Sequence, residues 1–156
     1  MATNNEQLAE TLNDLVRINN DRIEGYQRAS RETKDSDVDL QATFHKMAEE
    51  SQTYKNQLEQ RILALGEEPA KDTTVSGKIY RVWMDVKNTF TGADRESILA
   101  SCEFGEDAAQ KAYNEALDTD AEMDADTRQL IMEQKNSLKT SHDMIKKYRD
   151  LHDVSS

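Results

Sequence analysis

The chain has 156 residues, of which 31 are acidic and 20 are basic, so its formal net charge is −11 at pH 7. This length fits one domain covering residues 1–156, and the acidic balance argues against general nucleic-acid binding, which depends on neutralising phosphates. The single Pro, five Gly and one Cys exclude proline-rich repeats, a disulfide framework and a zinc site built from cysteines alone.

Targeting signals are the next feature that the sequence allows us to judge. The first residues carry neither the basic segment nor the apolar stretch of a signal peptide. No apolar run reaches the roughly 20 residues that a membrane span needs. The sequence therefore predicts a cytoplasmic protein that does not bind membranes, and one unpaired cysteine suits that reducing compartment.

Four long segments repeat apolar residues every three or four positions, which is the spacing of helices that each bury one face. This spacing predicts helices over residues 5–31, 36–65, 94–117 and 125–152. Short polar turns join the first helix to the second and the third to the fourth. We therefore expect two antiparallel hairpins, and no alternating pattern predicts a strand.

The segment between the second and third helices is much longer than an ordinary connection. Within it, residues 76–90 carry apolar side chains at helical spacing, which predicts a short extra helix. A single long crossover between two hairpins is typical of ferritin-type bundles. The sequence therefore predicts an all-α, ferritin-like four-helix bundle whose crossover carries a short helix.

The apolar face of this crossover helix has two interpretations. It packs on the bundle, or it forms an interaction face for a protein partner or a second copy of the chain, since tryptophan is enriched at interfaces. The surrounding residues 71–93 are mildly basic, with four basic and two acidic side chains. The face consists of Ile79, Trp83, Val86 and Phe90.

A bundle with one crossover raises the question of a di-iron site, which such bundles build from two Glu side chains and two Glu-x-x-His pairs. The chain has three histidines, His45, His142 and His152, and none follows a Glu by three positions. The middle of the second and fourth helices carries Ser51 and Ser141 instead of carboxylates. We therefore expect no standard di-iron site and no cofactor.

One carboxylate lies where a solvated residue is not expected. Glu106 falls in the middle of the apolar stripe of the third helix. Burying a lone charge costs several kcal/mol, so the carboxylate of Glu106 should be paired. We interpret it as part of a buried polar layer that fixes the register of the helices. The layer consists of Asn19, Arg22, Glu106 and Gln134.

A metal site is the alternative interpretation of the same region. Glu103 lies at the edge of the stripe that contains Glu106, and His142 lies at the edge of the stripe on the fourth helix. Carboxylates and imidazole together are ligands for iron and other divalent metals. Glu103, Glu106 and His142 are therefore the candidate metal ligands.

Four blocks of the chain carry a family resemblance, in residues 12–26, 77–83, 102–117 and 142–150. The most specific parts are Arg81-x-Trp83 and Glu103-x-Gly105-Glu106-Asp107. Together they resemble a bacterial family of ferritin-like four-helix-bundle proteins catalogued as a domain of unknown function. The resemblance implies a ferritin-like fold and no established activity.

We therefore expect a non-enzymatic bundle, associated with stress or acting as an interaction module, which forms a homo-oligomer. The alternative is an atypical metal-binding or oxidase-type protein with a site around Glu106. The acidic charge is concentrated in residues 94–126, which carry 11 acidic and two basic side chains. This charge does not distinguish the two functions. Most of these acids should be solvated.

Overall fold

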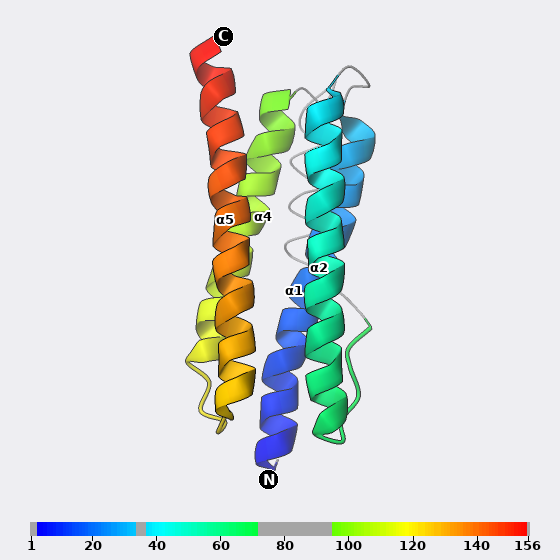
Figure 1. Cartoon of the computed structure of the whole chain (residues 1–156), viewed down its shortest axis with the longest axis vertical. Helices are drawn as coiled ribbons and strands as arrows, with labels where there is room; N and C mark the ends of the chain where they lie inside the picture. Colours follow the sequence, from blue (N-terminus) through cyan, green and yellow to red (C-terminus); the bar gives the residue numbers. More distant parts are fainter. Residues whose placement is uncertain (1–2, 34–36, 72–94, 156) are drawn as a thin grey trace.

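A computed structural model describes residues 3–33, 37–71 and 95–155 of the chain, and Figure 1 shows them as a bundle of long helices. No strand occurs in these ranges, so the all-α four-helix prediction is confirmed. The predicted helix over 76–90, with Ile79, Trp83, Val86 and Phe90, lies outside the described residues. The helices are α1 (Asn4–Glu32), α2 (Val38–Ala64), α4 (Arg95–Leu117) and α5 (Ala125–Ser155).

The order of the helices in space follows from where each begins and ends. In Figure 1, α1 rises from the N-terminus, α2 descends beside it, α4 descends from the same upper end, and α5 rises again. Two antiparallel hairpins result, α1–α2 and α4–α5. Since α2 ends at the lower end and α4 begins at the upper end, the hairpins follow one another as they do in bundles with a single long crossover.

The helix ends are set by capping residues. At the start of α1, the hydroxyl of Thr3 accepts a hydrogen bond from the backbone N–H of Glu6 at 3.1 Å. At the end of α2, Gly66 has a φ of 80°, a left-handed conformation that favours glycine. Its N–H bonds the carbonyl of Leu63, and the N–H of Glu67 bonds that of Ile62, which is a Schellman motif.

The apolar core forms two clusters along the length of the bundle. One cluster includes Leu12, Leu15, Leu58 and Leu138, toward the end that carries the N-terminus. The other surrounds Tyr26, with Phe44, Leu99, Cys102 and Ile145. Along each helix, a polar residue separates the two clusters, and these four residues lie at the middle of the bundle. They are Arg22, Ser51, Glu106 and Ser141.

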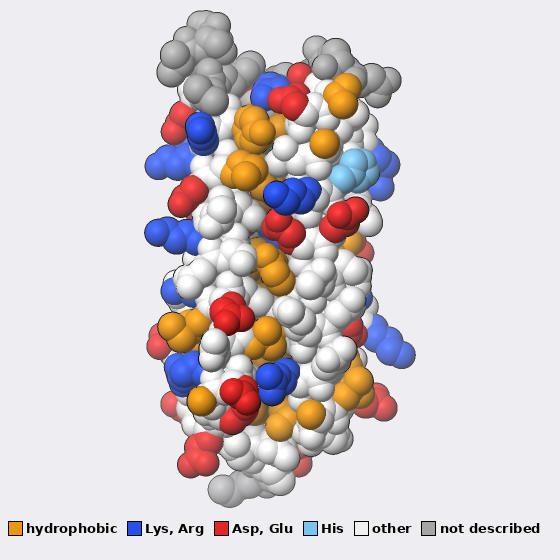
Figure 2. All heavy atoms as spheres, in the orientation of Figure 1, with side chains coloured by type: hydrophobic (Ala, Val, Ile, Leu, Met, Phe, Trp, Pro, Cys, Tyr) orange, Lys and Arg blue, Asp and Glu red, His pale blue; other side chains and the backbone are white. Residues whose placement is uncertain are grey.

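The outside of the bundle is charged. Figure 2 shows acidic and basic side chains interspersed over the visible face, with hydrophobic side chains along the boundary between α5 and α2. Among the helices that the structure describes, none is long and apolar enough to cross a membrane.

Candidate functional site

The middle of the bundle holds an ion pair between α1 and α4. Both side chains are fully buried, and the guanidinium of Arg22 donates from Nε at 2.8 Å and from Nη2 at 2.6 Å to Oε1 of Glu106. A third donor, the hydroxyl of Tyr26, reaches the same oxygen at 2.5 Å. Three donors therefore converge on one carboxylate oxygen, and the guanidinium neutralises the charge that the sequence placed in the core.

The rest of the guanidinium reaches a third helix. Nη1 of Arg22 donates to the hydroxyl of Ser51 on α2, and the guanidinium carbon lies 5.1 Å from the centre of the Tyr26 ring. Arg22 thus connects α1, α2 and α4 at one level. The second oxygen of Glu106, Oε2, is buried and makes no hydrogen bond with a residue in the described ranges.

The pKa values of Arg22 and Tyr26 are both raised next to the carboxylate of Glu106. Burial is the largest single influence and favours a neutral Arg22, but the charge and hydrogen bond of Glu106, together with the contribution of Tyr26, outweigh it and raise the pKa of the guanidinium above its usual value. Burial, reinforced by the charge of Glu106, raises the pKa of Tyr26 well above its usual value. The phenol therefore keeps its proton and acts as a donor to the carboxylate.

A second set of buried hydrogen bonds continues this layer toward α5. The amide of Asn19 donates to the hydroxyl of Tyr113 at 2.9 Å, and this hydroxyl donates to Oε1 of Gln134 at 2.7 Å. The amide nitrogen of Gln134 donates in turn to the carbonyl of Tyr54 at 3.2 Å. Asn19 and Tyr113 are fully buried and Gln134 nearly so, so the chain of bonds joins all four helices.

This donor set does not fit a di-iron centre. Two irons need several carboxylates and imidazoles that face one another inside the bundle. Here the four helices contribute Arg22, Ser51, Glu106 and Ser141 at that level, which is one carboxylate beside a permanent positive charge. The guanidinium occupies the position beside Oε1 that a cation bound to this oxygen would need.

A different group of potential ligands lies on the surface between α4 and α5. One ligand atom each of Glu103, Asp107 and His142 lies within 4.8 Å of the other two. Glu103 and Asp107 are one helical turn apart and therefore share a face of α4. Nε2 of His142 lies 2.6 Å from Oδ1 of Asp107, so a hydrogen bond joins the two helices.

Two neighbours complete this surface cluster. Oδ1 of Asp143 lies 3.3 Å from Nδ1 of His142, and Nη1 of Arg149 lies 2.6 Å from Oε2 of Glu103. Partial burial opposes the charged imidazole, but the hydrogen bonds to Asp143 and Asp107 outweigh it and raise the pKa of His142. Asp107 is the exposed member of the cluster, with 63 % side-chain accessibility, whereas His142 at 21 % and Glu103 at 14 % are largely buried.

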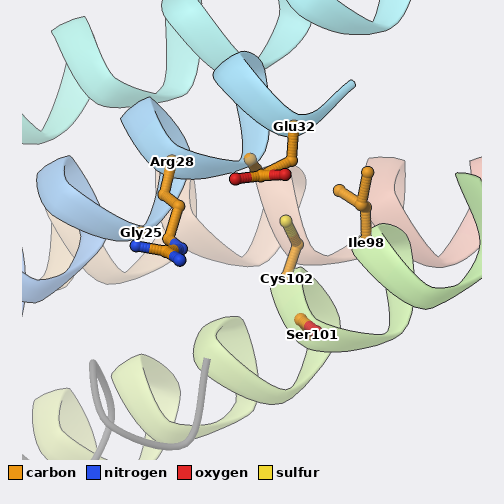
Figure 3. A pocket seen from close by; sticks show the side chains of 7 residues that line it. Gly25, Arg28, Glu32, Ile98, Ser101 and Cys102 are labelled. Atoms are coloured by element: carbon orange, nitrogen blue, oxygen red, sulfur yellow. The ribbon is translucent and has the colours of Figure 1, made fainter. Parts of the chain in front are cut away.

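A small cavity lies between α1 and α4, beside the lone cysteine. Figure 3 shows Gly25, Arg28 and Glu32 on one side and Ser101 and Cys102 on the other. Its volume is about 30 Å³, which holds one or two water molecules and no organic ligand. Burial raises the pKa of the Cys102 thiol well above its usual range, so the thiol is a poor nucleophile.

The structure divides the candidate metal ligands into two places. Glu106 lies in the core against Arg22, whereas Glu103 and His142 lie together at the surface. The predicted polar layer is buried, with Asn19, Arg22 and Glu106 fully buried and Gln134 2 % exposed.

Asp107 and Tyr113 are among the residues of these sites that the sequence did not identify. Asp107 could have been found from its position one turn after Glu103. Tyr113 lies among apolar residues of α4, and only the structure shows that its hydroxyl joins Asn19 to Gln134.

Solved structures with the same fold support the architecture. A mutant of Dps1 from Mycobacterium smegmatis is 12 % identical with a TM-score of 0.77, and the match covers 96 % of this chain and 99 % of that chain. A dodecameric thioferritin, the bacterioferritin-related protein of Bacteroides fragilis, is 18 % identical with a TM-score of 0.75, and the match covers 97 % of this chain and 88 % of that chain. Dps of Microbacterium arborescens in its high iron form is 16 % identical with a TM-score of 0.69, covering 93 % of both chains.

These identities establish the fold and nothing more specific. A comparison with curated proteins finds no significant match. Residues 7–119 match the family described as Domain of unknown function (DUF2383). The match includes α2, α4 and all but the first residues of α1. The chain therefore belongs to this family, and its fold is that of a ferritin-like four-helix bundle.

Proposed function

We propose that this protein is a non-catalytic ferritin-like bundle that works by assembling with copies of itself, and that an ion pair replaces a metal centre inside the bundle. The observation that carries the proposal is the guanidinium of Arg22, fully buried and 2.6–2.8 Å from Oε1 of Glu106. A dication next to Glu106 would have to displace or face this positive charge in a medium of low dielectric constant.

Assembly is the part of the proposal that the similar structures support. The thioferritin of similar fold is described as dodecameric. A surface that carries charges of both signs, as this one does, can form specific contacts between copies. The apolar face of Ile79, Trp83, Val86 and Phe90, predicted from the sequence, is a candidate contact that would add buried area.

The competing function is a metal-binding or oxidase-type protein centred on Glu106. Iron appears in the description of one similar structure, the Dps in its high iron form. The unpartnered Oε2 of Glu106 is the feature of the described residues that favours this alternative. Against it stand the three donors on Oε1 and the serines, Ser51 and Ser141, at the positions where two further ligands would be needed.

Ferrous oxidation and molar mass test the two halves of the proposal separately. Ferrous iron is added without oxygen to the full chain and to Glu106→Gln, oxygen is admitted, and the formation of ferric iron is followed by absorbance. We expect both proteins to match the buffer blank. A wild-type rate above the blank that disappears in Glu106→Gln would overturn the non-catalytic assignment.

The molar mass is measured by light scattering across a range of concentrations. We expect a discrete multiple of the 17.8 kDa chain mass. A mass of one chain at every concentration would overturn the assembly assignment and leave the iron result unaffected.

A further inference from the structure

We propose that Glu103, Asp107 and His142 form a surface site for a transition-metal dication of the zinc type, bridging α4 and α5. The site is separate from the ion pair in the core, and it does not depend on the proposed function. It rests on one imidazole and two carboxylates whose ligand atoms all lie within 4.8 Å of one another.

The spacing of the three groups suits one ion. Zinc binds nitrogen and oxygen at about 2.0–2.2 Å with tetrahedral geometry, so its ligand atoms lie roughly 3.3 Å apart. Nε2 of His142 lies 2.6 Å from Oδ1 of Asp107, and no two of the three ligand atoms lie more than 4.8 Å apart. Shifts of about 1 Å, reached by small side-chain rotations on partly exposed residues, would therefore seat the ion.

The orientation of the imidazole is the second observation. Protein zinc sites usually hold the ligating histidine by a hydrogen bond from its other ring nitrogen to a carboxylate or carbonyl. Nδ1 of His142 faces Oδ1 of Asp143 at 3.3 Å, which leaves Nε2 directed at Asp107 on α4. Asp143 is thus a positioning residue that fixes which nitrogen meets the metal.

The charge around the site identifies the ligand as a cation. Three carboxylates, Glu103, Asp107 and Asp143, surround the imidazole, and one guanidinium, that of Arg149, opposes them. Arg149 engages Oε2 of Glu103, so Oε1 is the oxygen that remains to bind an ion. Imidazole nitrogen favours zinc over magnesium and calcium, which select sets of oxygen ligands.

Zinc titration of the full chain, first stripped with a chelator, tests the site. Calorimetry with zinc chloride should give one ion per chain, and magnesium chloride should give no comparable binding. His142→Gln and Asp107→Asn should weaken zinc affinity by at least about 10-fold, and Asp143→Asn should do so by about 10-fold through the orientation of the ring.

Two further variants separate this site from general zinc binding. Arg149→Gln should tighten zinc binding by about fivefold, because it removes a positive charge next to the ion. If the three residues formed only a structural hydrogen-bond cluster, this change would not raise the zinc affinity. His45→Gln is the matched control, since His45 is exposed on α2 and should leave the affinity unchanged.

The thermal midpoint gives an independent readout, because an ion that binds only the folded chain raises it. The rise with zinc should be present in wild type and lost in His142→Gln. Equal zinc affinity in wild type and His142→Gln, or loss of affinity in His45→Gln alone, would overturn the proposal.

Discussion

Glu106 and Asp107 are neighbours in the sequence, and α4 sends them into opposite environments. Glu106 is fully buried, and three donors from α1 meet one of its oxygens. The side chain of Asp107 is 63 % exposed and meets one imidazole of α5. Because consecutive helical residues are rotated by about 100°, one helix can hold a structural charge and an accessible charge side by side.

This contrast has a thermodynamic meaning. In the core, removing one partner leaves the other charge without water or a counter-ion, so the penalty is large. At the surface, water replaces a lost partner and the penalty is small. The same carboxylate chemistry therefore stabilises the fold at Glu106 and remains available for a ligand at Asp107.

The largest expected effect is at the core pair. Glu106→Ala or Arg22→Ala should lower the free energy of unfolding by about 3–5 kcal/mol, because each leaves an uncompensated buried charge. Urea denaturation followed by circular dichroism measures the loss.

A combined apolar replacement distinguishes a buried-charge penalty from a packing penalty. Arg22→Met, Tyr26→Phe and Glu106→Leu together should recover most of the stability, since an apolar core of similar volume replaces the network. If the combined variant were less stable than both single variants, the pair itself would be the source of stability, and a buried-charge penalty would not explain the single losses.

The second effect concerns the extension of the buried layer. Tyr113→Phe should lower the free energy of unfolding by about 1–3 kcal/mol, because Oε1 of Gln134 and the amide of Asn19 lose a buried partner. Tyr148→Phe is the control. It also removes a tyrosine hydroxyl, but it keeps the ring, whose centre lies 5.8 Å from the guanidinium carbon of Arg95. Equal losses in both variants in thermal denaturation would contradict the assigned role of the Tyr113 hydroxyl.

The third-largest effect is expected at Asp124, the carboxylate at the start of α5. Asp124 accepts hydrogen bonds from the hydroxyl of Thr127 at 2.5 Å and from its backbone N–H at 3.2 Å, so it caps α5. Asp124→Ala should lower the free energy of unfolding by about 1 kcal/mol.

The contribution of this cap should also depend on pH in one direction. The hydrogen bond from the Thr127 hydroxyl lowers the pKa of Asp124 below 3.8. The stabilisation is therefore complete above the unfolded-state value and disappears as the pH falls through the lowered folded-state value. The difference between wild type and Asp124→Ala, measured by urea denaturation, should shrink only below about pH 4; a difference that shrank near neutral pH would contradict this.

The smallest effect is expected at the exposed neighbour of Glu106. Asp107→Asn should change the free energy of unfolding by less than about 1 kcal/mol in the absence of metal, because surface ion pairs contribute little. Measured beside Glu106→Gln under the same conditions, it compares two adjacent carboxylates directly. A loss as large as that of Glu106→Gln would remove the contrast between core and surface.

Much of this architecture is predictable from helical periodicity. The spacing of apolar residues placed the four helices within three residues of their observed ends. The position of Glu106 within such a stripe was enough to infer that it is buried and paired. Arg22 could be selected as a partner because it lies on the inner face of α1.

Contacts between helices are harder to predict, because they depend on how far one helix slides along another. The pairing of Asp107 with His142 needs the relative register of α4 and α5, which no local pattern specifies. The convergence of Arg22 and Tyr26 on a single oxygen of Glu106 likewise depends on rotamers that only packing selects.

The single cysteine makes the opening of this bundle measurable. Cys102 is fully buried beside a cavity of about 30 Å³, too small to admit a disulfide reagent. Labelling of the native protein therefore requires an opening of the packing around Cys102, so the rate of thiol exchange reports how often this part of the core opens. The natural cysteine thereby serves as a reporter of local opening in the core, with no substitution needed to introduce one.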